Sequence, residues 1–222
     1  MSSDLDKLGY LLQCFSDAGS LIEFAGEKGS GKTSLLHMIC SKNTLQNKKT
    51  LYIDGSGDFR PEKIHDYLEK SAIHVEKEQI IQYLKNISYV RIYEPDSIFK
   101  ILRRIKLLDV DCVVIDDLII LCLHTLRSKM RLEVRMFVRD MALLALVKKI
   151  NIIFTNTIIS RIDTIDSGPI SYELFYNDLI RYVHVRGMLH KLTRNVIDCN
   201  FIYPKKLDTI KLQIGVTRTF TQ

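Results

Sequence analysis

The sequence lacks the features of a membrane or exported protein. No segment reaches the roughly 18 uninterrupted apolar residues that a membrane span needs, because Asp116 and Asp117 interrupt the most apolar stretch, Cys112 to Leu123. The first residues, Met1 to Asp4, carry neither a basic region nor an apolar one, so we expect no export signal. Repeats and linkers rich in glycine, proline or serine are also missing. We therefore expect one domain that spans residues 1–222.

The cysteines follow no pattern typical of a disulfide framework or a zinc site. There are five of them, an odd number, at positions 14, 40, 112, 122 and 199, and no CxxC pair occurs. Most lie in apolar contexts, where a free cysteine behaves as a small core residue. We therefore expect an intracellular protein in a reducing compartment. Its net charge of +6 permits a polyanionic partner without requiring one.

Apolar runs that alternate with helical stretches predict a parallel sheet with crossover helices. The expected strands are Ser20–Ala25, Thr50–Asp54, Ile87–Arg91, Cys112–Asp116 and Asn151–Thr155. The expected helices are Lys32–Ser41, Pro61–Glu69, Lys77–Lys85, Asp96–Leu107 and Lys129–Lys149. After Pro169, three further strands are expected at Arg181–Arg186, Met188–Cys199 and Thr209–Val216. The predicted fold class is α/β, with a mostly parallel central sheet, helices on both faces and antiparallel C-terminal strands.

Residues 26–33 match the phosphate-loop pattern G-x-x-x-x-G-K-[ST] in full, between an expected strand and an expected helix. Glycines let backbone N–H groups turn toward phosphates, and the helix N-terminus adds the positive end of its dipole. We expect Lys32 to reach the β- and γ-phosphates in a catalytic role, and the Thr33 hydroxyl to hold Mg²⁺. The alternative is a chance glycine-rich turn. The predicted nucleotide-binding residues are Gly26, Glu27, Lys28, Gly29, Ser30, Gly31, Lys32, Thr33 and Ser34.

A second element supports the phosphate loop. Val113–Asp117 is an apolar strand that ends in two carboxylates. A carboxylate at the carboxyl end of a parallel strand lies beside the phosphate loop and can hold Mg²⁺ through water. Asp116 is the predicted magnesium-binding and catalytic residue, with Asp117 as the alternative. Acidic residues also end many strands without any function, so this argument depends on the loop.

The segment Leu51–Ile64 narrows the choice of protein family. Its sequence, LYIDGSGDFRPEKI, closely resembles the pattern Y-I-D-T-E-G-x-F-R-P-E-R of the RecA/RadA recombinases. Asp4–Leu8 is similar to their LDKLL segment, and Gly19–Phe24 to their GSITEMFGE segment. Asn86–Arg91 and Asn151–Asn156 resemble the family's NVAYARAFNTD and VVITNQ segments.

The resemblance covers nearly the whole chain, as the bare ATPase core. It implies a RecA-like P-loop core that binds ATP and Mg²⁺, without the family's N-terminal DNA-binding domain and hydrophobic linker. We expect a core-only recombinase paralog, either archaeal (RadB-like or RadC-like) or a short eukaryotic one. An archaeal protein would be cytoplasmic and a eukaryotic one nuclear.

Three positions depart from the family's active site. Ser56 stands where the family has the glutamate that orients the attacking water, and serine is a poor general base near neutral pH. Asp58 is the candidate substitute. Thr157 replaces the glutamine that senses the γ-phosphate, and Lys63 replaces the arginine that covers the adenine, unless Lys63 is simply a solvated helix residue. ATP binding with weak hydrolysis is the expected result.

Candidate DNA contacts follow the fourth expected strand, because the family's first DNA-binding loop corresponds to about residues 121–132. The predicted contacts are Arg127, Lys129, Arg131 and Arg135, with Arg139 continuing the same helix face. The alternative is a solvated helix whose arginines pair with Glu133 and Asp140. The second loop, about residues 160–178, is acidic, and we assign its Tyr172, Phe175 and Tyr176 to core or partner contacts. Arg186, His190, Lys191 and Arg194 form a further candidate phosphate contact.

The leading hypothesis is an accessory recombinase paralog that binds ATP and single-stranded DNA and assists homologous recombination and DNA repair. Its expected partner is a RadA-type recombinase or another paralog. The alternative is a non-catalytic module whose bound ATP stabilises a hetero-oligomer, with little direct DNA binding. A third hypothesis, an active DNA-dependent ATPase, requires that Asp58 or another carboxylate replace the missing glutamate.

Overall fold

The computed structural model describes residues 6, 9, 19–71, 77–117, 119, 130–161, 170–173, 175–204 and 209–214. The strands are β1 (Leu21–Glu27), β2 (Thr50–Asp54), β3 (Ile87–Arg91), β4 (Cys112–Asp116), β5 (Asn151–Arg161), β6 (Ile170–Glu173), β7 (Val185–Lys191), β8 (Val196–Tyr203) and β9 (Ile210–Gln213). The helices are α2 (Lys32–Leu45), α3 (Pro61–Ser71), α4 (Lys77–Leu84), α5 (Pro95–Ile105), α7 (Met130–Lys148) and α8 (Tyr176–Leu179).

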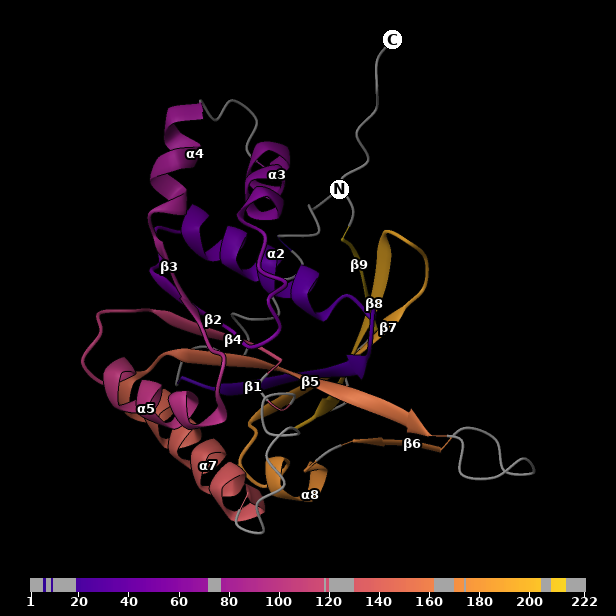
Figure 1. Ribbon diagram of the computed structural model, residues 1–222. Helices are drawn as coiled ribbons and strands as arrows, with labels where there is room; N and C mark the ends of the chain where they lie inside the picture. The colour runs from indigo at the N-terminus through magenta and orange to yellow at the C-terminus, as the bar shows by residue number, and fades with distance from the viewer. Residues whose placement is uncertain are drawn as a thin grey trace.

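The strands form one sheet in the order β3-β2-β4-β5-β1-β7-β8-β9, with β6 paired to β5 (Figure 1). Along this order, neighbouring strands are parallel up to the β1–β7 pair, and the β7–β8 and β8–β9 pairs are antiparallel. Strands β2 and β4 are buried along their whole length, as expected of parallel strands covered on both faces. The predicted fold class is confirmed.

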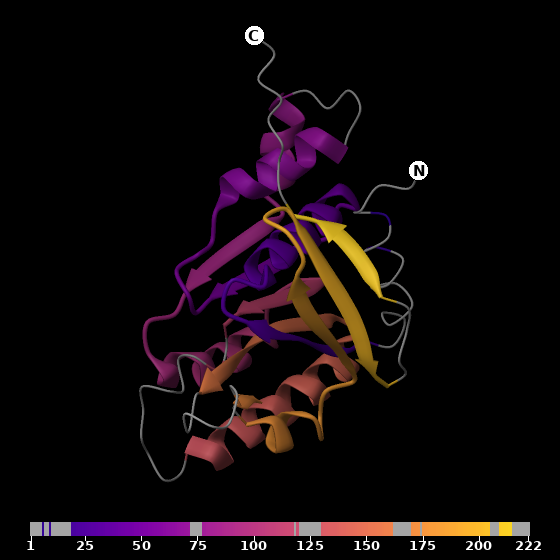
Figure 2. The ribbon, with the colours of Figure 1, turned by 90° about the vertical axis from the view of Figure 1, so that its right-hand side faces the viewer.

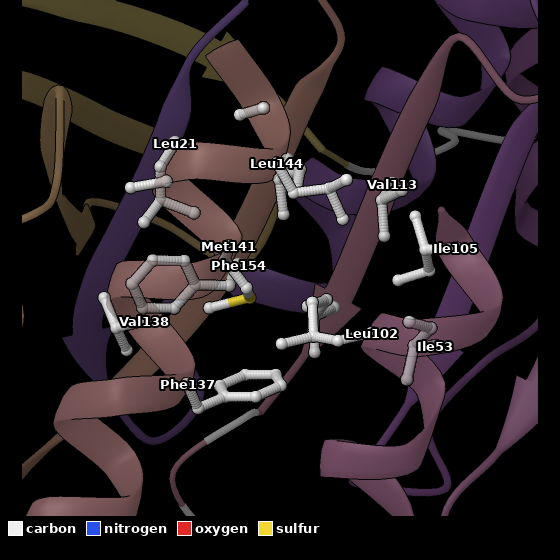
Figure 3. Close-up of a cluster of buried hydrophobic side chains, with 14 of the residues drawn as sticks. Leu21, Ile53, Leu102, Ile105, Val113, Phe137, Val138, Met141, Leu144 and Phe154 are labelled. Atoms are coloured by element: carbon white, nitrogen blue, oxygen red, sulfur yellow. The ribbon is translucent and has the colours of Figure 1, made fainter. Parts of the chain in front are cut away.

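Helices cover both faces of the sheet. α2, α3 and α4 lie on one face, and α5, α7 and α8 lie on the other (Figures 1 and 2). On the α5–α7 side, Phe137 and Met141 of α7 pack against Leu21, Val113 and Phe154 from three neighbouring strands (Figure 3). No described helix is both long enough and apolar enough to cross a membrane.

The predicted bounds of the three strands Thr50–Asp54, Ile87–Arg91 and Cys112–Asp116 match the structure. The boundaries predicted after Pro169 are wrong. Residues 181–184 are not part of a strand, and the stretch Met188–Cys199 contains a chain reversal between β7 and β8. The reversal is closed by the N–H groups of Leu192 and Thr193, which both donate to the Val196 carbonyl. Because no glycine or proline marks this turn, its sequence did not reveal it.

Candidate phosphate site

The candidate phosphate loop joins β1 to α2. Gly29 and Gly31 have φ angles of 79° and 94°, in the left-handed region that favours glycine. A Cβ atom at Gly26 would lie only 2.5 Å from Ser30 Oγ and 2.8 Å from the Leu189 carbonyl oxygen, so the loop also needs glycine for close packing. The Ser30 hydroxyl is buried and has no hydrogen-bond partner among the described residues. A loop of this shape, with an unsatisfied donor, fits a phosphate oxygen.

Lys32 begins α2 and is almost fully buried. Its Nζ donates to the carbonyl oxygens of Gly26 and Glu27, at 3.0 and 2.9 Å. Burial lowers the pKa of Lys32, and the carboxylates of Asp117 and Asp116 oppose that shift. The ammonium group is therefore held inside the loop by neutral carbonyl groups, which a phosphate can replace as the stronger acceptor.

Asp116, at the end of β4, accepts hydrogen bonds from three hydroxyl groups. Thr33 Oγ1 and the Tyr52 hydroxyl donate to its Oδ2 at 2.8 and 3.0 Å, and Thr155 Oγ1 donates to its Oδ1 at 2.9 Å. Burial raises the pKa of Asp116, and these three hydrogen bonds counteract it. The structure thus places the two predicted metal residues, Thr33 and Asp116, in direct contact. A hydroxyl and a carboxylate are both ligand types that Mg²⁺ prefers.

Asp117, the alternative metal residue, follows β4 with a φ of 56°. Its carboxylate accepts a hydrogen bond from Thr157 Oγ1 at 3.2 Å. Burial raises the pKa of Asp117, and the charge of Lys32 opposes the shift. Thr157, which was predicted to replace a sensor glutamine, therefore contacts a carboxylate beside the candidate phosphate loop.

Asp54 organises the turn that carries Ser56, and sequence reasoning missed it. Its carboxylate accepts hydrogen bonds from the Gly57 N–H (2.7 Å), Ser56 Oγ (3.1 Å), the Tyr89 hydroxyl (3.0 Å) and Arg91 Nη1 (2.8 Å). Burial alone would raise the pKa of Asp54, but these partners lower it below its ordinary value. Ser56 Oγ also lies 3.5 Å from Asp116 Oδ2. The available signal was an aspartate that ends the apolar run Leu51–Ile53 directly before a Gly-Ser-Gly turn.

His37 connects α2 to the same turn and was also missed. Its ring stacks on Tyr52 and contacts Phe59, and its Nε2 accepts the Arg60 N–H at 3.3 Å. Burial lowers the pKa of His37 to about 4, so the ring is neutral at physiological pH. Lys63, the predicted adenine contact, is exposed in the first turn of α3.

Comparison with known proteins identifies the family of the chain. The Rad51 family model matches residues 1–172, more than half of the chain. The chain belongs to the Rad51 family. The predicted resemblance to RecA/RadA recombinases is confirmed, and the fold is similar to that of the RadB recombinase crystal structure, with a TM-score of 0.70. That match has 18% identity and covers 92% of this chain and 93% of the other.

Curated relatives of this Rad51 family chain are named as DNA repair proteins. The DNA repair protein RAD51 homolog B of Zea mays is 26% identical over 172 residues, 71% of this chain and 49% of the relative. The DNA repair and recombination protein RadA of Methanococcus voltae is 30% identical over 139 residues, 53% of this chain and 42% of the relative. The chain spans about half the length of such relatives.

Two of the predicted DNA-binding residues of this family member, Arg131 and Arg135, lie in α7. Arg127 and Lys129 fall outside the described residues. Arg131 Nε and Arg135 Nε donate to the two carboxylate oxygens of Asp178, at 2.6 and 2.9 Å. Burial of Asp178 opposes its ionisation, but the two arginines lower its pKa below the ordinary value. Arg131 and Arg135 thus have their partner in α8, whereas Arg139 pairs with Asp140, as the alternative expected.

Arg186 is buried and does not face solvent as a phosphate contact would. Its guanidinium lies 3.1 Å from Glu23 Oε2, pairs with Glu173, and packs 4.7 Å from the centre of the Tyr176 ring. Burial raises the pKa of Glu23 to about 8, against the opposing charge of Arg186. The other members of that predicted contact, His190, Lys191 and Arg194, are exposed.

Proposed function

We propose that this chain is an accessory recombinase paralog that binds Mg-ATP and single-stranded DNA and assists homologous recombination and DNA repair. The observation that carries the proposal is the contact between Thr33 and Asp116 beside the buried Lys32. In this proposal Lys32 would hold the β- and γ-phosphates, and Thr33 and Asp116 would hold Mg²⁺, which neutralises phosphate charge when it is bound. Membership of a family whose relatives are named as DNA repair proteins supports an intracellular role of this kind.

We propose that ATP hydrolysis is weak, because the Ser56 hydroxyl is already engaged in hydrogen bonds within its own turn. Its hydroxyl donates to Asp54 Oδ1 and accepts the Asp58 N–H at 3.1 Å. A serine with these bonds is a poor acceptor for a proton from water, and loss of a water-positioning base lowers rates by about 10²- to 10⁴-fold. Asp58 is exposed, and its carboxylate is close enough to raise the pKa of Asp117. Asp58 is therefore the residue to test if hydrolysis proves fast.

The test is ATP binding and steady-state hydrolysis, with and without single-stranded DNA, for the unmodified chain, Lys32→Ala and Ser56→Glu. Lys85→Ala, in the exposed turn that follows α4, serves as the control. We expect Mg-ATP binding that Lys32→Ala abolishes, and slow turnover that Ser56→Glu increases. Fast DNA-stimulated turnover that Ser56→Glu leaves unchanged and Asp58→Asn removes would instead support an active ATPase.

A second candidate function is a non-catalytic module whose bound ATP stabilises a hetero-oligomer with a RadA-type recombinase or another paralog. The ion pairs of Arg131 and Arg135 with Asp178 favour it, because these arginines are already neutralised within the protein. DNA affinity that falls with salt and collapses in Arg131→Ala/Arg135→Ala would support the first function. Absence of DNA binding without a partner protein would support the second.

A further inference from the structure

The outward face of α7 carries apolar side chains toward both ends of the helix. Five of its side chains are between 44% and 80% exposed: Leu132, Met136, Leu143, Leu146 and Val147. Exposed apolar residues are ordinary when they are scattered, but a contiguous row marks an interaction surface. At about 1.5 Å per residue, the 19 residues of α7 make a helix about 28 Å long, and the row from Leu132 to Val147 covers about 22 Å of it.

This row is separate from the face that α7 presents to the sheet. The buried face consists of Val134, Phe137, Val138, Met141, Leu144 and Ala145, several of which Figure 3 shows against the strands. A helix that is apolar on two faces is typical of one with protein on both sides. α5 and α8 lie beside α7, and no described helix or strand covers its outward side (Figures 1 and 2).

The spacing of the outward row is that of a coiled-coil seam. Leu132, Met136, Arg139, Leu143 and Leu146 alternate steps of four and three residues. The end of α5 extends the apolar surface, because Lys148 Nζ donates to the carbonyl oxygens of Ile105 and Leu108, and the intervening Leu107 is 88% exposed. The centre of the seam is polar: Arg139 donates to its neighbour Asp140 at 2.8 Å.

We propose that this face binds a second copy of the chain, with the two α7 helices antiparallel about a two-fold axis between residues 139 and 140. In that register Leu132 lies opposite Val147 of the second copy, and Met136 opposite Leu143. Arg139 then lies opposite Asp140, so the surface complements itself in charge as well as in apolar pattern. A parallel arrangement would place Arg139 against Arg139, which like-charge repulsion disfavours.

The test is the mass of the full chain in solution, measured by sedimentation equilibrium over a series of concentrations. We expect a dimer that Leu143→Glu weakens by at least about 30-fold, as burial of a charge at the centre of an interface does. The control is Ile81→Glu, which alters a similarly exposed apolar residue on α4, on the opposite face of the sheet, and leaves the dimer intact. A chain that stays monomeric at its highest soluble concentration, or a dimer that Leu143→Glu does not affect, would overturn the proposal.

Charge reversal tests the antiparallel register. Arg139→Asp and Asp140→Arg each place like charges across the axis and should each weaken the dimer. The double variant restores opposite charges and should recover it. Both positions are about half exposed, so we expect the variants to fold, and circular dichroism checks this. Single variants as dimeric as the unmodified chain, or a double variant that recovers nothing, would refute this interface.

Discussion

Two regions of the molecule use buried carboxylates in different ways. At the phosphate loop, the described partners of the Asp116 carboxylate are hydroxyl groups, and the described acceptors of Lys32 Nζ are neutral carbonyl oxygens. At the α7–α8 end, Asp178 and Glu23 hold arginine side chains directly. The first arrangement leaves charge available to a ligand, and the second satisfies charge within the protein. The phosphate-loop region is therefore the candidate for ligand binding, and the arginine–carboxylate pairs are the candidates for a stabilising role.

The largest effect on stability is expected from removing the charge of Arg186, which connects β7 to β1 and β6. Arg186→Met leaves Glu23 and Glu173 without their shared cation and should lower the free energy of unfolding by about 3–5 kcal/mol. Urea denaturation measures the change. Arg194→Met, at an exposed position, is the control and should change stability by less than about 0.5 kcal/mol. Equal effects of the two substitutions would show that Arg186 is not structurally important.

His37 should make the stability of the folded chain fall in acid. Its pKa in the folded chain, about 4, lies below the ordinary 6.5, so the folded state binds the proton less tightly than the unfolded state. The resulting stability is complete above pH 6.5 and is lost as the pH falls toward 4, by up to about 3 kcal/mol. His37→Gln should flatten the stability–pH curve in this window, whereas His65→Gln, on the solvent side of α3, should not. A curve unchanged by His37→Gln would contradict the prediction.

Asp116→Asn keeps the shape of the side chain but removes the charge that a metal ion needs. We expect Mg-ATP affinity to fall by about 10- to 100-fold, as when a metal site loses a supporting carboxylate. Affinity for ATP measured in EDTA should stay unchanged, which separates metal binding from damage to the loop. Asp117→Asn is the matched variant. If it produces the loss of magnesium dependence and Asp116→Asn does not, the metal residue is Asp117.

The smallest expected effect concerns the arginines of α7. Asp178→Asn should cost only about 1 kcal/mol of stability, because the released Arg131 and Arg135 are partly exposed and can be solvated. If these cations lie on the DNA path, their release should raise single-stranded DNA affinity and steepen its salt dependence. Glu78→Gln, which removes an exposed carboxylate on α4 and leaves the Asp178 pairs in place, is the control. DNA affinity unchanged by Asp178→Asn would assign Arg131 and Arg135 to structure alone.

Sequence reasoning succeeded where the determining interactions are local. Strand β2 alternates with helices of clear apolar period, and its bounds were predicted correctly. Strand β5 was predicted to end at Thr155, yet it continues to Arg161. Asn156, Thr157 and Ile158 still pair with β1, and Ile158–Arg161 pair with β6. The pairing with β1 depends on a segment distant in the chain, and the apolar pattern of β5 alone could not reveal it.

The sequence by itself predicted the phosphate loop and determined the family, because eight consecutive residues and a few short motifs carry that information. It also determined the layered α/β fold, since the period of apolar residues is a local property. Only the tertiary structure decided which carboxylate holds which cation. Asp178 lies 43 and 47 residues from the arginines that it binds, and Arg186 is buried by strands from both halves of the chain. Contacts of this kind arise when elements pack, so a charge that looks free in the sequence is satisfied in the fold.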